Sequence, residues 1–123
     1  MSEHSLISVV DDDESVRESL PDLLREFGFA AQAFSSAEEF LASGSLSQTR
    51  CLILDVAMPG MSGPDLQREL ALRRQEIPIV FISAHEDDNI RQYVLQQGAV
   101  ECLLKPFSDS ALLAALTTAL RVN

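Results

Sequence analysis

Four short apolar runs of this sequence each end at polar residues that could take part in chemistry. The runs and the residues that follow them are Ile7–Val10 before Asp11, Asp12 and Asp13, Cys51–Leu54 before Asp55, Ile79–Ile82 before Ser83, and Cys102–Leu104 before Lys105. Carboxylates packed together repel one another, so they either take up protons or hold a cation. A cation held beside a hydroxyl and an ammonium group could bind a phosphoryl group, and we expect phosphoryl transfer where these residues meet.

The expected cation is Mg²⁺, because it binds through one or two carboxylates and keeps waters for a phosphorylated substrate. Zinc is a poorer fit, since the sequence has only two histidines and both cysteines lie within predicted strands. The sequence contains neither a G-x-x-x-x-G-K loop nor a G-x-G-x-x-G motif, so nucleotide binding is not expected.

Asp55 is the expected nucleophile toward phosphorus. Lys105, the only lysine of the chain, would bring a positive charge to one phosphoryl oxygen, and Ser83 a hydrogen bond to another. Phosphatases of the haloacid dehalogenase type also use a strand-end aspartate, but they typically carry a second acid two residues later. Ala57 occupies that position here, which weakens the phosphatase alternative.

Helical patterns alternate with the apolar runs along the chain. Helices are predicted over about residues 14–27, 35–42, from 64, 86–97 and from 108. Pro21 lies inside the first helix and is expected to kink it or to weaken its first turns. Phe29–Phe34 is a weaker strand candidate because its alanines have a poor strand preference.

Five strands alternating with five helices predict an α/β fold with a parallel sheet covered on both faces. We expect a doubly wound, five-stranded, flavodoxin-like sheet of order 2-1-3-4-5, forming one domain over residues 1–123. Ligands of such sheets bind outside the carboxyl ends of the strands, where the strand order reverses. Asp11, Asp12 and Asp55 would meet at that point.

The charge balance is acidic, with 19 aspartates and glutamates against 9 lysines and arginines and a net charge of −10. Direct binding to nucleic acid is not expected, because duplex affinity depends largely on Lys and Arg. No apolar stretch is long enough to span a bilayer, and no secretory signal is evident. Cys51 and Cys102 fall in strands that should not be neighbours, so free thiols and a cytoplasmic location are expected.

Across essentially its whole length the chain resembles the receiver domain of two-component response regulators, whose fold is CheY-like. The segments that carry this resemblance are Val9-Val10-Asp11-Asp12, Leu54 to Gly63, Ile82-Ser83-Ala84 and Leu104-Lys105-Pro106-Phe107. The loop Met58–Gly63 and the Lys-Pro-Phe segment look most like the FixJ–NarL class of transcriptional regulators.

The resemblance implies a role in phosphoryl transfer for several of these residues. Asp55 would be the phosphoacceptor, charged by the phosphohistidine of a sensor histidine kinase. Ser83 would be the switch hydroxyl, and Lys105 would bind the phosphate and precede a cis peptide bond to Pro106. Such a domain would promote only its own phosphorylation and dephosphorylation, acting as a switch and not as an enzyme. His85, two residues past Ser83, could face the phosphoryl group or be solvated.

The resemblance also implies a magnesium site. Asp12 and Asp55 would bind Mg²⁺ directly, Asp11 would act through water, and the backbone carbonyl of Ala57 would be a further ligand.

Cys102 departs from the family pattern. It lies three residues before Lys105, where the family usually has a Tyr or Phe that turns inward when the switch hydroxyl moves. A thiol cannot fill that space as a ring does, so the signal would instead pass through the loop after Ser83 and the helix over 86–97. The same departure keeps an alternative open, namely a pseudo-receiver that binds proteins without being phosphorylated.

Phosphorylation would reshape the surface formed by the last two helices and the strand between them, where a homodimer could form. The resemblance to FixJ–NarL regulators implies a C-terminal DNA-binding output domain that is absent from this chain. A stand-alone regulator is the alternative.

Overall fold

The computed structural model describes residues 5–121, in which strands and helices alternate as the sequence predicts. The elements in chain order are β1 (Leu6–Val10), α1 (Glu14–Glu26), β2 (Ala30–Phe34), α2 (Ala37–Ala42), a 3₁₀ turn (Leu46–Gln48), β3 (Thr49–Asp55), α3 (Gly63–Leu72), β4 (Ile79–Ser83), α4 (Asp88–Gln96), β5 (Glu101–Leu104) and α5 (Asp109–Arg121). The weak strand candidate is confirmed as β2. The short 3₁₀ turn lies in the connection from α2 to β3.

The five strands form one parallel sheet in the predicted order β2-β1-β3-β4-β5. Val10 pairs with Leu54, Asp55 pairs with Ile82, and Ser83 pairs with Leu104. This register aligns β1, β3, β4 and β5, so the carboxyl ends of these four strands lie at a single edge of the sheet. The reversal of strand order between β1 and β3 places the acidic residues that follow them side by side.

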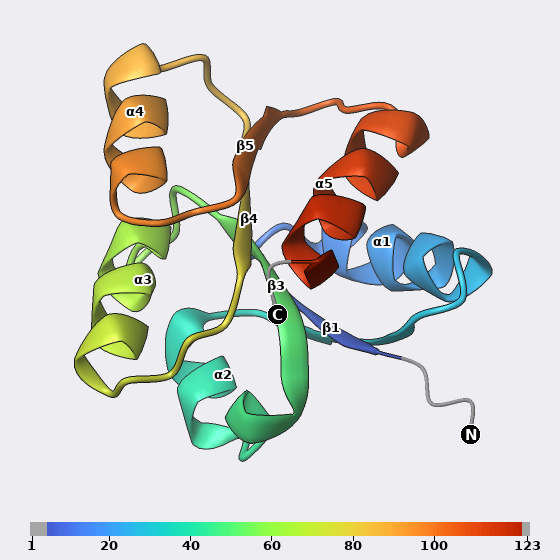
Figure 1. The fold of residues 1–123 in the computed structure, drawn as a ribbon, viewed down its shortest axis with the longest axis horizontal. Coiled ribbons are helices and arrows are strands. Elements are labelled where there is room, and N and C mark those ends of the chain that lie inside the picture. The colour runs from blue at the N-terminus through green and yellow to red at the C-terminus, as the bar shows by residue number, and fades with distance from the viewer. Residues whose placement is uncertain (1–4, 122–123) are drawn as a thin grey trace.

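Helices cover both faces of the sheet. Figure 1 shows α1 and α5 on one side, and α2, α3 and α4 on the other. Side chains alternate across each strand, so β3 sends Leu52 and Leu54 to the α2–α3–α4 side and Cys51 and Ile53 to the α1–α5 side. Burial on both faces explains why the strands read as continuous apolar runs.

Side-chain caps fix where the helices begin. The Ser36 hydroxyl accepts a hydrogen bond from Glu39 N, and the Ser108 hydroxyl accepts one from Ala111 N. At α3 the Ser62 hydroxyl and the Asp65 carboxylate form a complete capping box that the sequence analysis did not identify. α1 is assigned as one unbroken helix that contains Pro21.

Both cysteines are buried and free, as expected. Cys51 lies in β3 and Cys102 in β5, with β4 between these two strands. The assignment of residues 1–123 to one domain stays a prediction.

Candidate functional site

Three carboxylates meet at the edge where β1 and β3 end. Oxygen atoms of Asp11, Asp12 and Asp55 all lie within 4.8 Å of one another. Asp11 is fully buried and Asp55 is 6% exposed, whereas Asp12 faces solvent. A cluster of this kind combines mutual repulsion with burial, so it favours a bound cation or an added proton.

The Lys105 ammonium group enters this cluster from the end of β5. Its Nζ lies 2.9 Å from Asp11 Oδ2 and 3.6 Å from Asp55 Oδ1. The hydrogen bond to Asp11 and the nearby charge of Asp55 raise the pKa of Lys105 against the opposing effect of burial. The lysine is therefore charged at neutral pH and in contact with two of the three predicted acids. The peptide bond between Lys105 and Pro106 is cis, as expected from the resemblance.

Burial raises the pKa of Asp55 to about 7, with a further contribution from the charge of Asp11. Lys105 acts in the opposite direction but does not cancel these two effects. A carboxylate with such a pKa is a stronger base than an ordinary aspartate, and a bound cation would restore its charged form.

Backbone contacts hold Asp11 in place at the start of α1. Its Oδ1 accepts a hydrogen bond from Asp13 N at 2.9 Å, and its carbonyl accepts one from Arg17 Nη1 at 2.9 Å. The Asp13 carboxylate accepts a hydrogen bond from Ser15 N at 3.0 Å and so caps the start of α1.

The loop that follows Asp55 turns back tightly against the strand. Gly63 N donates a hydrogen bond to Val56 O at 2.9 Å, and a Cβ at Gly63 would lie only 2.3 Å from Asp55 O. Glu38 of α2 supports the same loop, because its Oε2 accepts a hydrogen bond from Met61 N at 3.2 Å. Neither Gly63 nor Glu38 is among the site residues predicted from the sequence. The Gly63 role carries a weak signal, a glycine directly before the predicted start of a helix at residue 64, and the Glu38 role carries none.

Ser83 lies at the same edge but is not bonded to the acidic cluster. Its hydroxyl donates to His85 O at 2.8 Å and accepts from His85 N at 3.2 Å. The hydroxyl is thus occupied by the loop that leads to α4. His85 is exposed, and the orientation of its ring toward a phosphoryl group stays a prediction.

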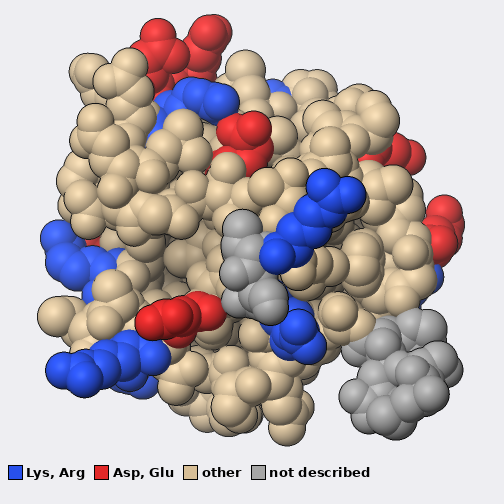
Figure 2. All heavy atoms as spheres, viewed as in Figure 1, with Lys and Arg blue, Asp and Glu red and all other residues tan. Residues whose placement is uncertain are grey.

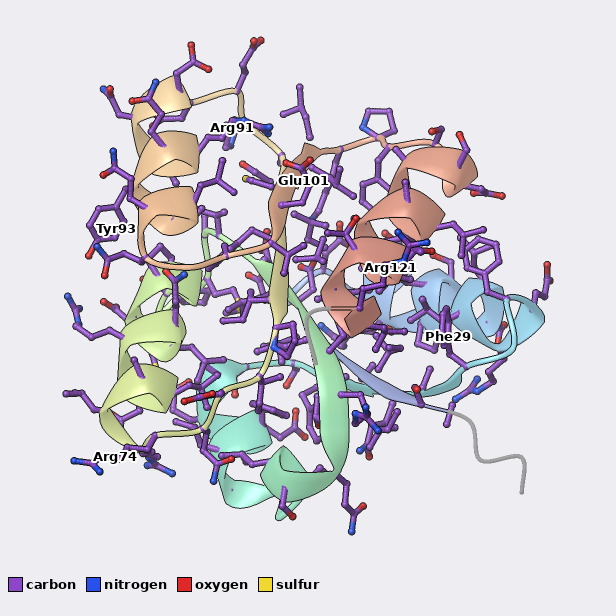
Figure 3. The ribbon with its side chains drawn as sticks, in the orientation of Figure 1. Phe29, Arg74, Arg91, Tyr93, Glu101 and Arg121 are labelled. Atoms are coloured by element: carbon purple, nitrogen blue, oxygen red, sulfur yellow. The ribbon has the colours of Figure 1, made fainter. Side chains whose placement is uncertain are left out.

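Cys102 lies away from the acidic cluster, beside α4. Its side chain is 8% exposed and lines a cavity of about 540 Å³ together with Ile90 and Leu104. Arg91 of α4 donates hydrogen bonds to the Cys102 carbonyl and, at 2.9 Å, to Glu101 Oε1. Figure 3 shows Arg91 and Glu101 pointing toward each other across the gap between α4 and β5. This contact was not predicted from the sequence.

The donor set suits a hard divalent cation. All three side chains offer carboxylate oxygens, which Mg²⁺ prefers, and the exposed Asp12 leaves the site open to water and to a phosphorylated substrate. Three carboxylates against one ammonium group leave an excess of negative charge for a cation to neutralise. A site with this charge balance can hold Mg²⁺ and bring a nucleophilic carboxylate to a phosphoryl group.

Comparison with known proteins connects this geometry to a family. Residues 7–117 match the family model described as the response regulator receiver domain. The chain is 44% identical over 120 residues to the response regulator protein TmoT of Ectopseudomonas mendocina, covering 98% of this chain and 54% of the relative. The chain therefore spans about half the length of the curated relatives it matches.

Two solved structures share both fold and sequence with this chain. The response regulator StyR is 45% identical with a TM-score of 0.90, over 98% of this chain and 61% of that one. FixJ-N is 36% identical with a TM-score of 0.86, over 98% of this chain and 96% of that one.

None of the helices between residues 5 and 121 is long and apolar enough to cross a membrane.

Proposed function

The chain belongs to the response regulator receiver domain family of two-component systems, and we propose that Asp55 is the residue on which it accepts a phosphoryl group. The observation that carries this proposal is the meeting of Asp55, Asp11, Asp12 and the Lys105 ammonium group at one sheet edge. The donor is the phosphohistidine of a sensor histidine kinase. The comparisons give no support to a pseudo-receiver.

Transfer requires a nucleophile and fixed positive charge around the phosphoryl group. An Asp55 carboxylate oxygen forms the new bond to phosphorus while the bond from phosphorus to the histidine nitrogen breaks, and the leaving imidazole takes up a proton. Lys105 Nζ, 3.6 Å from Asp55 Oδ1 before reaction, binds a phosphoryl oxygen. The ammonium group is positioned in advance, so it needs little rearrangement during the reaction.

We assign the metal site to the carboxylates of Asp12 and Asp55, to Asp11 through water and to the backbone carbonyl of Ala57. Mg²⁺ bound there would neutralise charge on the phosphoryl oxygens. The repulsion among the three carboxylates gives these residues a reason to bind a cation, and burial of Asp11 and Asp55 strengthens it.

Ser83 would report the phosphorylated state. To bind a phosphoryl oxygen, its hydroxyl must leave the carbonyl of His85, and this exchange pulls on the loop before α4. Phosphorylation would in this way shift α4 and β5 without an aromatic ring at Cys102.

Partners beyond the kinase follow from the relatives. We propose that the surface of α4, β5 and α5 pairs with a second copy of the chain or with a DNA-binding output domain. The chain spans about half the length of the curated relatives it matches, and a DNA-binding domain would supply the transcriptional output. The acidic net charge of −10 favours contact with DNA through such a domain over contact through these residues.

The test is incubation with a small-molecule phosphodonor, with Mg²⁺ or with a chelator, followed by the intact mass of the protein. We expect a gain of one phosphoryl group that requires Mg²⁺ and disappears in Asp55→Asn. The variant Asp65→Asn is a matched control, because Asp65 is a half-buried helix-capping carboxylate outside the acidic cluster, and its loss should leave the gain unchanged. A gain that survives Asp55→Asn would overturn the proposal.

A further inference from the structure

The β3–α3 loop, residues 56–62, is held firmly at its two ends. At its start, Val56 N donates a hydrogen bond to Ile82 O of β4 at 3.0 Å. At its end, Gly63 N donates to Val56 O at 2.9 Å, and Ser62 begins α3 with its capping box. Backbone and helix-cap contacts therefore fix where the loop leaves β3 and where it enters α3.

The middle of the loop, residues 57–61, has a single polar contact. Among the residues that the structure describes, the only hydrogen bond of this segment runs from Met61 N to Oε2 of Glu38, at 3.2 Å. Met58, 8% exposed, adds an apolar anchor, because it belongs to the same core cluster as Phe40 of α2. One carboxylate of α2 and one buried methionine thus hold the middle of the loop.

Glu38 lies directly against the loop backbone. A Cβ at Gly60 would come 3.0 Å from Glu38 Oε2, so the glycine leaves the room that the carboxylate occupies. Glu38 forms no ion pair within residues 5–121, so no base competes with Met61 N for its oxygens. A hydrogen bond from a backbone N–H to a carboxylate is stronger than one between neutral groups. The contact can therefore restrain the loop although Glu38 is exposed.

The restrained segment carries part of the proposed magnesium site. Ala57, whose backbone carbonyl is assigned above as a metal ligand, lies in it, two residues after Asp55. A segment that samples several conformations loses conformational entropy when one of its carbonyls binds a metal. A contact that orders the segment beforehand lowers this cost and strengthens metal binding.

From these contacts we propose that Glu38 is a positioning residue for the magnesium site. By accepting a hydrogen bond from Met61 N, it restricts residues 57–61 and keeps the Ala57 carbonyl available to the metal. Glu38 acts through the loop, and its carboxylate is not part of the acidic cluster. The inference rests on the proposed function, because it concerns the metal site assigned there.

Charge is a second way in which Glu38 could strengthen the binding of a cation. The chain has a net charge of −10, and Figure 2 shows acidic side chains at the upper end, along the right-hand margin and in the lower half of one face. An effect of charge alone acts through space and is screened by salt. The hydrogen bond depends instead on an acceptor oxygen. A glutamine, which keeps an oxygen and loses the charge, separates the two effects.

The test begins with the metal-free chain. In Glu38→Ala the Met61 amide loses its acceptor, so its exchange with water should rise at least about threefold, measured by NMR on ¹⁵N-labelled protein with a chelator present. Glu38→Gln should leave this exchange close to the wild-type value. Amides of α2 and α3 should exchange as in the wild type, which shows that the variants are folded.

The affinity for Mg²⁺ is the second readout. Titration of Mg²⁺, followed by amide chemical shifts, should give a Kd about threefold higher for Glu38→Ala and unchanged for Glu38→Gln. Threefold corresponds to about 0.7 kcal/mol, the size expected of one hydrogen bond. Phosphorylation by a small phosphodonor should be slower in Glu38→Ala at low Mg²⁺ but should reach the wild-type rate when Mg²⁺ saturates the site, since the contact favours metal binding and not the bond-forming step.

Glu39→Ala is the matched control. Glu39 is the next residue of α2, is also exposed and carries the same charge. Its carboxylate accepts hydrogen bonds from Ser35 N and Ser35 Oγ, and it forms none with residues 56–62. We expect the Mg²⁺ affinity and the exchange of the Met61 amide to stay unchanged in this variant.

Unchanged Mg²⁺ affinity in Glu38→Ala, an equal loss in Glu38→Gln, or an equal loss in Glu39→Ala would each overturn the positioning role. A loss confined to Glu38→Ala supports it. Because Mg²⁺ affinity is measured without a phosphodonor, a wild-type chain that binds Mg²⁺ but takes up no phosphoryl group contradicts the proposed function and still allows the role of Glu38 to be decided. A wild-type chain that binds no Mg²⁺ overturns both.

Discussion

The acidic cluster and the α4–β5 region share one edge of the sheet, yet they are held together differently. Asp11 and Asp55 are buried at the ends of central strands. α4 buries a single residue, Val94. Two side chains attach the helix to its neighbours by donating to backbone carbonyls. Gln67 of α3 donates to Val94 O at 3.1 Å, and Arg91 of α4 donates to the Cys102 carbonyl.

This difference separates two tasks. The proposed phosphate-accepting residues would need fixed positions, and neighbouring strands in register supply such positions. The responding helix must move at a small free-energy cost, so few buried contacts and a neighbouring cavity suit it. If the two regions are separate, a substitution that weakens one of them should leave the other unaffected.

The largest effect is expected from Gly63→Ala. A Cβ at this position would lie 2.3 Å from Asp55 O and 2.9 Å from the Phe81 ring, so the loop behind Asp55 must shift. We expect the free energy of unfolding to fall by about 3 kcal/mol, measured by urea denaturation. Gly44→Ala is the control, because Gly44 has a positive φ of +78° but no atom within 4 Å, and should cost only about 1 kcal/mol. Equal losses of stability in the two variants would show that the close approach of position 63 to Asp55 O does not exclude a side chain there.

The next effect concerns Asp55 and pH in the presence of a chelator. With a folded-state pKa of about 7, Asp55 holds a proton that the unfolded chain releases near pH 4. Stability therefore falls as pH rises from about 4 to about 7, and Asp55→Asn removes this loss. Above pH 7 we expect the variant to be more stable than the wild type by about 2 kcal/mol, a difference that vanishes below pH 4. A difference independent of pH would contradict the raised pKa.

A smaller and local effect is expected from Arg91→Ala. Loss of the contacts to the Cys102 carbonyl and Glu101 should raise amide hydrogen exchange in α4 about tenfold, while β1 and β3 stay protected. Arg68→Ala is a matched control, because Arg68 forms a surface ion pair with Asp65 at 2.8 Å, far from the contacts of α4 with β5. Faster exchange in β1 or β3 would mean that the two regions are not separate.

The smallest effect is expected from Gln67→Leu. The variant removes the hydrogen bond from Nε2 to Val94 O, but that carbonyl still accepts from Ala99 N at 3.0 Å and is not left unsatisfied. We expect exchange at the carboxyl end of α4 to rise about threefold, with little change in global stability. A loss of global stability as large as that of Gly63→Ala would contradict this prediction.

The fold and the acidic cluster could be predicted from sequence for one physical reason. Strands buried on both faces read as apolar runs, and parallel strands bring the residues after each run to one edge. Asp11, Asp55 and Lys105 therefore met as expected, although they lie far apart in the sequence. The boundaries were less accurate, since β5 begins at Glu101 and β3 at Thr49.

The side-chain contacts of the α4–β5 region could not be predicted from the sequence. The Ser83 hydroxyl turns toward His85 O, and Arg91 reaches the Cys102 carbonyl, through rotamers that no spacing pattern reports. The cavity beside Cys102 is likewise formed by three separate segments. Sequence periodicity indicates which residues are buried, but it does not show where packing leaves a cavity.

The most direct test of the account is to locate the phosphoryl group. After reaction with a small phosphodonor and Mg²⁺, borohydride reduces an aspartyl phosphate to homoserine, and trypsin then releases residues 51–68 between Arg50 and Arg68. We predict homoserine at position 55 alone, and none when Mg²⁺ is chelated. Homoserine at position 11, 12 or 13, or an unmodified 51–68 peptide in a protein that has gained a phosphoryl group, would contradict Asp55 as the phosphoacceptor.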